Sequence, residues 1–279
     1  MEATKVPFKS NFIEGLASDL AIDKWEKNNG DFIGSHQPQY LSSFPRSGNG
    51  WVRLVLAATL LELKGIDCDS VELTRETTDT GVGYICFKTD AAVYSLEDVF
   101  PDMYLSDFRS NKEKMAKDIR GLELQHKVIK THHIVDISNR KTVFLFRDPH
   151  RCLTSASLLL NKEPIERNPV EINETITYLA KYYDKMLESY LSQKSNAPDN
   201  CLLIDNAALY GDLAVAKIKI TLDFLGIEAE ESTVEKVIDK YPLRSAYNKQ
   251  FEQHVTEETK MAVENLMMDK YRQAIAAAS

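Results

Sequence analysis

A short strand-like segment that runs into a turn and then into a helix constrains the fold more than any other feature. Residues 39–44 read as a strand, and residues 45–50 (PRSGNG) form a turn-forming cluster. From Trp51 the apolar side chains recur at helix spacing, and Gly65 lies where such a helix would end. A strand that passes directly into a helix is typical of α/β proteins.

The rest of the chain continues this alternation. Short apolar segments predict further strands at residues 126–130, 141–146 and 201–204. Periodicity predicts a helix that ends near residue 160 and others at residues 171–192, 212–225 and about 256–275. The first 35 residues read as an irregular lead-in with one short helix, and residues 66–125 as loops with a short helix. We predict an α/β fold with a mostly parallel central sheet flanked by helices on both sides. No repeat or linker interrupts the pattern, so residues 1–279 are predicted to form a single domain.

Composition excludes several classes of protein. A formal net charge of −8 argues against nucleic-acid binding, which needs a basic surface. No apolar run reaches the roughly 20 residues that cross a bilayer, and the N-terminus lacks the pattern of a signal peptide. We therefore expect no membrane association and a cytoplasmic location. The four cysteines are scattered, which predicts reduced, buried thiols and no metal site.

The turn at residues 45–50 contains groups that could bind an anion. A helix N-terminus presents backbone N–H groups at the positive end of the helix dipole. Gly48 and Gly50 allow close approach of a ligand, Ser47 and Asn49 add donors, and Arg46 adds a positive charge. Taken alone, the same residues also fit an ordinary tight turn. Neither GxxxxGK[ST] nor a GxGxxG after a strand is present, which disfavours the usual nucleotide-binding loops.

Residues 43–53 (SFPRSGNGWVR) resemble the 5′-phosphosulfate loop of the sulfotransferase family, whose common forms read YPKSGTTW and FPRSGNTW. The resemblance implies a P-loop-like sulfotransferase fold and use of 3′-phosphoadenosine 5′-phosphosulfate (PAPS), with PAP as product and no metal required. It assigns cofactor binding to the loop residues Arg46, Ser47, Gly48, Asn49, Gly50 and Trp51. The departure is Gly50, where the family usually has a threonine that helps hold the 5′-phosphate.

Two later segments resemble the same family in the expected order. Residues 143–149 (VFLFRDP) with Ser155 are similar to its 3′-phosphate segment, which assigns Arg147 and Ser155 to that phosphate. Residues 128–133 (VIKTHH) are similar to its KTHLP stretch. That likeness implies that His132 is the general base and that Lys130 helps neutralise the transferring group, with His133 as the fallback base. On its own, a pair of neighbouring histidines is more often a packed or solvent-facing feature.

The C-terminal likeness is partial. Residues 244–256 resemble RKGxxGDWKNHFT, which implies a phosphate contact from Arg244 and matches His254 and Thr256. The dimer motif KxxxTVxxxE is not retained, so the oligomeric state is left open. The adenine-contacting tyrosine of the family is missing after the strand at 201–204, which leaves Trp51 and Phe251 as candidates for stacking on the base.

Together these segments predict a PAPS-dependent sulfotransferase that modifies a hydroxyl or amine of a small molecule. Arg46 and Lys130 would stabilise the growing negative charge, and His132 would take the acceptor's proton. The net charge mildly favours a cationic or polar acceptor, with residues 84–104 and 160–170 as pocket walls. The alternatives are an ATP-dependent P-loop phosphotransferase, which should carry a loop lysine followed by Ser or Thr, and a non-enzymatic anion-binding module.

Overall fold

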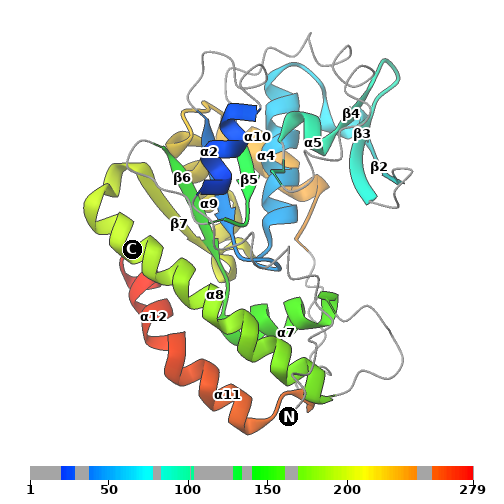
Figure 1. The fold of residues 1–279 in the computed structure, drawn as a ribbon. Coiled ribbons are helices and arrows are strands. Elements are labelled where there is room, and N and C mark those ends of the chain that lie inside the picture. The colour runs from blue at the N-terminus through cyan, green and yellow to red at the C-terminus, as the bar shows by residue number, and fades with distance from the viewer. Residues whose placement is uncertain are drawn as a thin grey trace.

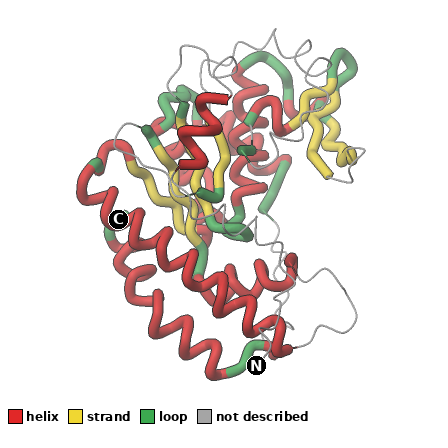
Figure 2. Tube along the Cα trace, viewed as in Figure 1, coloured by secondary structure: helices red, strands yellow, loops and turns green. Residues whose placement is uncertain are grey.

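The central sheet consists of four parallel strands. The computed structural model describes residues 20–28, 38–77, 83–100, 102–103, 128–133, 140–160, 169–243 and 253–278. Within these residues the sheet has the order β5-β1-β6-β7. The strands are β1 (Gln39–Ser43), β5 (Val128–Thr131), β6 (Thr142–Phe146) and β7 (Cys201–Asp205), which lie side by side in Figure 2. The predicted parallel sheet is confirmed.

Helices cover both faces of this sheet because successive strand residues point to opposite sides. Tyr40 and Phe144 belong to one buried cluster, and their neighbours Leu41 and Val143 belong to the other. The first cluster is closed by α2 (Leu20–Asn28), α7 (Pro149–Leu160), α8 (Pro169–Asn196), α11 (Glu257–Val263) and α12 (Asp269–Ala276). The second is closed by α4 (Asn49–Leu63), α5 (Leu96–Val99), α9 (Leu213–Phe224) and α10 (Glu231–Lys240). Figure 1 shows the two layers, and the prediction of helices on both sides is confirmed.

The strand order places a topological switch point at β1. β5 pairs with one side of β1, and the next strand in the chain, β6, pairs with the other side. The order of the strands therefore reverses direction at β1. In open α/β sheets, ligands bind outside the carboxyl ends of the strands at such a switch point.

The prediction of loops for residues 66–125 was wrong where three strands form between residues 72 and 95, whereas the predicted short helix is confirmed as α5. That region contains a three-stranded antiparallel sheet formed by β2 (Glu72–Thr77), β3 (Gly83–Lys88) and β4 (Val93–Ser95). In Figure 1 it stands at the side of the molecule, away from α11 and α12. β2 reads ELTRET and its Leu73 is exposed, so the strand has no apolar alternation that would reveal it. The helix α10 was also not predicted.

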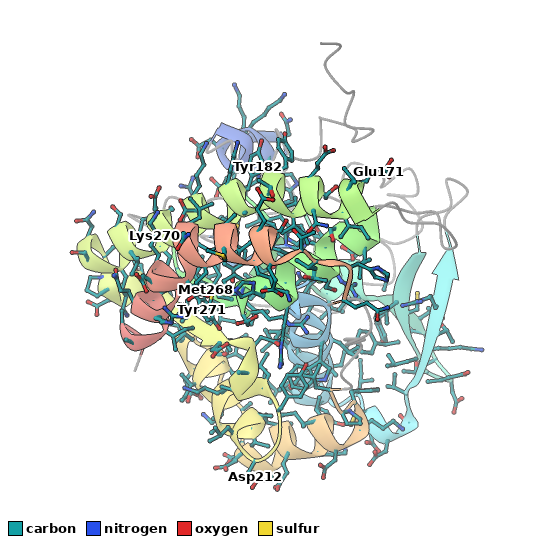
Figure 3. All side chains as sticks on the ribbon, turned by 90° about the horizontal axis from the view of Figure 1, so that it is seen from below. Glu171, Tyr182, Asp212, Met268, Lys270 and Tyr271 are labelled. Atoms are coloured by element: carbon teal, nitrogen blue, oxygen red, sulfur yellow. The ribbon has the colours of Figure 1, made fainter. Side chains whose placement is uncertain are left out.

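The C-terminal helices lie along α8. α11 and α12 are joined by a π-helical turn, η6 (Glu264–Met268), so the helix predicted at 256–275 is confirmed with a local irregularity. Lys270 donates to Asp184 and Glu188 of α8 at 2.7 and 2.6 Å. Figure 3 labels Lys270 on the C-terminal helix that runs beside α8. Short 3₁₀ turns occur at η1 (Cys68–Ser70), η3 (Pro198–Asn200) and η4 (Asn206–Leu209). None of the helices in the described part of the chain is both long and apolar enough to cross a bilayer.

The prediction that the cysteines are buried thiols is confirmed. All four are buried, and none forms a disulfide. Burial raises the pKa of the Cys68, Cys152 and Cys201 thiols to about 12. These thiols are therefore protonated and unreactive at neutral pH.

Candidate active site

The loop after β1 has an unusual backbone conformation. Arg46 adopts a positive φ of 71°, and Gly48 adopts 98° as the N-cap of α4. The Ser47 N–H donates to Phe44 O at 3.2 Å, which closes the turn. The first N–H groups of α4 lack intrahelical acceptors by helix geometry, and the helix dipole is positive there. The loop thus places a helix N-terminus at the carboxyl edge of the sheet.

Gly48 is favoured by its backbone conformation, and a side chain there would also have to displace the side chain of Asn206. A Cβ at this position would lie 2.4 Å from Asn206 Nδ2, far inside van der Waals contact. Asn206 follows β7 directly and is buried. Sequence reasoning missed this residue. The signal for it was its position at the end of a predicted strand, on the same edge as the loop.

The basic residues that the resemblance assigned to the two phosphates come together. Arg46 Nε donates to Ser155 Oγ at 3.0 Å, across 109 residues of sequence. Arg147 Nη1 donates to Arg46 O at 3.1 Å. Tyr183 on α8 fixes the Arg147 backbone, since its hydroxyl donates to Arg147 O at 2.6 Å and lies 3.2 Å from Arg147 N, which donates to it. Two guanidinium groups and a hydroxyl therefore gather beside the N-terminus of α4.

The other polar side chains of the loop brace it in this structure. Ser47 is fully buried, and its Oγ lies 3.4 Å from the thiol of Cys152, which donates to Pro45 O at 3.2 Å. Asn49 Nδ2 donates to Ser43 Oγ at 3.0 Å. Trp51 Nε1 donates to Tyr241 O at 2.7 Å, which fixes the indole at the start of α4. Because these side chains already form hydrogen bonds within the protein, the backbone N–H groups are the donors that the loop can offer to an anion.

Lys130 and His132 are in direct contact at the end of β5. Lys130 is 3% exposed, and its Nζ lies 2.6 Å from His132 Nε2 and 2.8 Å from Asp102 Oδ2. His132 Nδ1 lies 2.5 Å from Ser43 O. A carbonyl oxygen only accepts, so Nδ1 carries the ring proton and Nε2 has the lone pair that accepts from Lys130. The histidine is thus linked to the last residue of β1.

The electrostatics of this pair favour a neutral histidine beside a charged lysine. Burial, followed by the neighbouring Lys130 charge, lowers the pKa of His132 to about 3. Burial also lowers the pKa of Lys130, but the Asp102 carboxylate opposes this effect. Burial alone would raise the pKa of Asp102, yet Lys130 and Arg53 outweigh it and lower that pKa. An unprotonated imidazole is the form that a general base requires.

Several predicted residues lie elsewhere or outside the described part of the chain. Arg244 and Phe251 lie outside the described residues, so their predicted roles stay predictions. Thr256 caps α11 through its hydroxyl, which accepts from Thr259 N at 3.2 Å, and His254 O accepts from Asn173 Nδ2 at 3.0 Å. Both are therefore engaged in holding the C-terminal segment.

Within the described ranges, one set of possible metal ligands comes together: Glu62, Asp67 and Cys68. It lies at the end of α4 remote from the loop. The Lys236 ammonium is 2.9 Å from Glu62 and 2.7 Å from Asp67, so a cation from the chain already occupies it.

The strand ends, the helix N-terminus and the basic cluster give this α/β protein a set of groups suited to an anionic ligand at the carboxyl edge of its sheet. Comparison with protein-family models identifies the family: the model of the sulfotransferase domain matches residues 38–275. The chain therefore belongs to the sulfotransferase domain family and has an α/β sulfotransferase fold, with the transferase activity that defines that family.

Two solved structures resemble the chain at low sequence identity. The sulfotransferase domain from the Synechococcus PCC 7002 olefin synthase is 14% identical, with a TM-score of 0.40, over 88% of this chain and 97% of that one. Retinol dehydratase, solved in a complex with retinol and PAP, is 15% identical, with a TM-score of 0.45, over 84% of this chain and 81% of that one. A comparison with curated proteins finds no match. The assignment rests on the family model.

Proposed function

We propose that this protein transfers a sulfuryl group from PAPS to a hydroxyl or amine of a small molecule, releasing PAP. One observation carries the proposal: Arg46, Arg147 and Ser155 meet beside the αL glycine that opens α4. Cations and hydroxyl donors at a helix N-terminus suit a ligand with two separate anionic groups. The donor set therefore fits the phosphosulfate and the 3′-phosphate of PAPS, as the sequence resemblance implies.

The chain's own residues provide a route for the proton and for the developing charge. PAPS supplies an activated sulfuryl group whose bond to the 5′-phosphate oxygen breaks as the acceptor bonds to sulfur. Arg46 and Lys130 neutralise the negative charge that grows during this exchange. His132 Nε2 takes the acceptor's proton, a role worth about 10²–10⁴ in rate. Because Lys130 occupies that lone pair in this structure, its ammonium must turn from His132 toward the transferring group.

Two features support the remaining parts of the proposal. The four cysteines are buried and form no disulfide, which suits a reducing compartment, so we place the protein in the cytoplasm. The net charge of −8 favours a cationic or polar acceptor over a polyanion. We propose no role for a metal ion, because the transferred charge is matched by arginine and lysine side chains.

A ligand comparison tests the proposal directly. PAP should raise the melting temperature of the protein, whereas ATP with Mg²⁺ and NAD should not. Mass spectrometry after incubation with PAPS and a panel of alcohols and amines should detect a product with one added sulfuryl group.

The double variant Arg147→Ala with Ser155→Ala should lose most of the stabilisation by PAP, since it removes both groups assigned to the 3′-phosphate. Arg75→Ala is the matched control, because Arg75 is an exposed arginine on β2. Stabilisation by ATP with Mg²⁺ alone would contradict the sulfotransferase proposal and favour a phosphotransferase.

A further inference from the structure

Lys130 belongs to a network of four charged side chains. The other three are Arg53 from α4, Glu97 from α5 and Asp102. Arg53 Nη2 donates to Glu97 Oε1 at 2.9 Å, and Arg53 Nη1 lies 3.6 Å from Asp102 Oδ2. The same Asp102 oxygen lies 2.8 Å from Lys130 Nζ. Asp102 is therefore shared by two cations, whereas Glu97 pairs with Arg53.

The backbone holds Asp102 in place beside β5. Asp102 forms a parallel β-bridge with Lys130, and Met103 N donates to Lys130 O at 2.9 Å. The Asp102 N–H donates to Glu97 Oε2, also at 2.9 Å. The carboxylate is thus fixed at the lysine by main-chain contacts as well as by charge. Asp102 is thus placed to influence the reaction through Lys130, without contact with the substrate.

We infer that Asp102 is a positioning residue: its carboxylate keeps the Lys130 ammonium charged and held against His132 Nε2 until the substrates bind. This inference rests on the proposed function, because Lys130 and His132 are the reacting pair assigned there. It adds a third member, on a different segment, to the two residues that the KTHLP likeness suggested.

The surroundings of Lys130 show why a counter-charge is needed. A lysine that is almost fully buried tends to lose its proton, because burial disfavours the charged form. The groups that face it are Asp102, Arg53, Glu97 and His132. The Arg53 charge lowers the pKa of Lys130 further, while Asp102 is the main group that raises it. Without Asp102 the lysine would become neutral at a lower pH and could no longer stabilise the transferring group.

The variant Asp102→Asn tests this inference because asparagine keeps the shape and removes the charge. The alkaline limb of the kcat profile should move to lower pH by about one to three units, the usual effect of an opposite charge at this distance. The Lys130 titration in the free protein, followed by NMR of 13C-labelled lysine and assigned with Lys130→Arg, should move in the same direction. Glu97→Gln is the matched control, since it disturbs the same cluster through Arg53. It should move both titrations in the same direction but clearly less than Asp102→Asn, because Glu97 raises the pKa of Lys130 less than Asp102 does.

Three outcomes would overturn the inference. The first is an unchanged alkaline limb and an unchanged Lys130 titration in Asp102→Asn. The second is an equal displacement in Glu97→Gln, which would indicate a general loosening of the cluster. The third is a shift of the alkaline limb of the kcat profile in Asp102→Glu, because this variant keeps the negative charge. Asp102→Glu also replaces Asp102→Asn as the test if the asparagine variant does not fold. The NMR titration needs no substrate, so it tests Asp102 even if PAP fails to bind and the proposed function is rejected.

Discussion

Replacement of Gly48 by alanine is the sharpest test of how the loop is built. Two costs add at this position. A φ of 98° is in the left-handed region, which costs a residue with a Cβ about 1–2 kcal/mol. The new Cβ would also lie 2.4 Å from Asn206 Nδ2, and overpacking of a buried site costs about 1–3 kcal/mol. The free energy of unfolding should therefore fall by about 2–5 kcal/mol.

Gly50 supplies the control two residues away. Space around it is open, since a Cβ there meets nothing within 4 Å. Gly50→Ala should leave the free energy of unfolding unchanged or raise it by up to about 1 kcal/mol, because alanine favours helix. Guanidinium denaturation followed by circular dichroism measures both variants.

A double-mutant cycle separates the two costs. Asn206→Ala should relieve the steric part in the Gly48→Ala background and leave the backbone part of about 1–2 kcal/mol. Equal stability of Gly48→Ala and Gly50→Ala would refute the reasoning. So would a double variant that shows no recovery, because the contact with Asn206 would then have no energetic weight.

Two further predictions follow from the site. Gly50→Thr restores the family's hydroxyl and should tighten PAP binding by roughly ten- to a hundredfold, the worth of one hydrogen bond to a charged group. Calorimetry measures it against Gly50→Ala, and binding no tighter than in that control would count against the predicted contact. The depressed pKa of His132, about 3, means that the unfolded chain binds a proton below about pH 6.5 while the folded chain does not. Stability should therefore fall as the pH drops from about 6.5 toward 3, by at most about 1.4 kcal/mol per unit for this group. His132→Gln should remove that part of the slope, and an unchanged slope in denaturation at pH 7 and 5.5 would contradict the assignment.

In the central sheet, β6 and β7 were predictable as short apolar runs, whereas β1 reads QYLSS and was recognisable by the turn-forming residues that follow it. The same logic failed for β2, whose polar sequence pairs with β3 through its backbone and shows no periodicity. Arg147 and Ser155 could be placed near the loop only through the family resemblance, since nothing local in the sequence brings them to Arg46. Asp102 was not predicted for the same reason.

Tertiary placement also explains what sequence patterns missed at Gly48. The need for glycine there comes partly from Asn206, which follows the distant strand β7, and no pattern around residue 48 contains that neighbour. Local signals identify a loop that can bind an anion. The side chains that press against it are known only once the sheet is assembled.

The parallel order of the central sheet has a consequence for how this protein folds. The contacts that build the site join residues far apart in the chain: 89 residues separate Ser43 from His132, 101 separate Arg46 from Arg147, and 190 separate Trp51 from Tyr241. Contacts of this kind form late and slowly, because the chain must close long loops before they contribute. A chain that is still being synthesised has β1 and its loop long before the residues that complete the site. Affinity for adenosine 3′,5′-bisphosphate would therefore report the finished fold, and a folding intermediate with native helices would lack it.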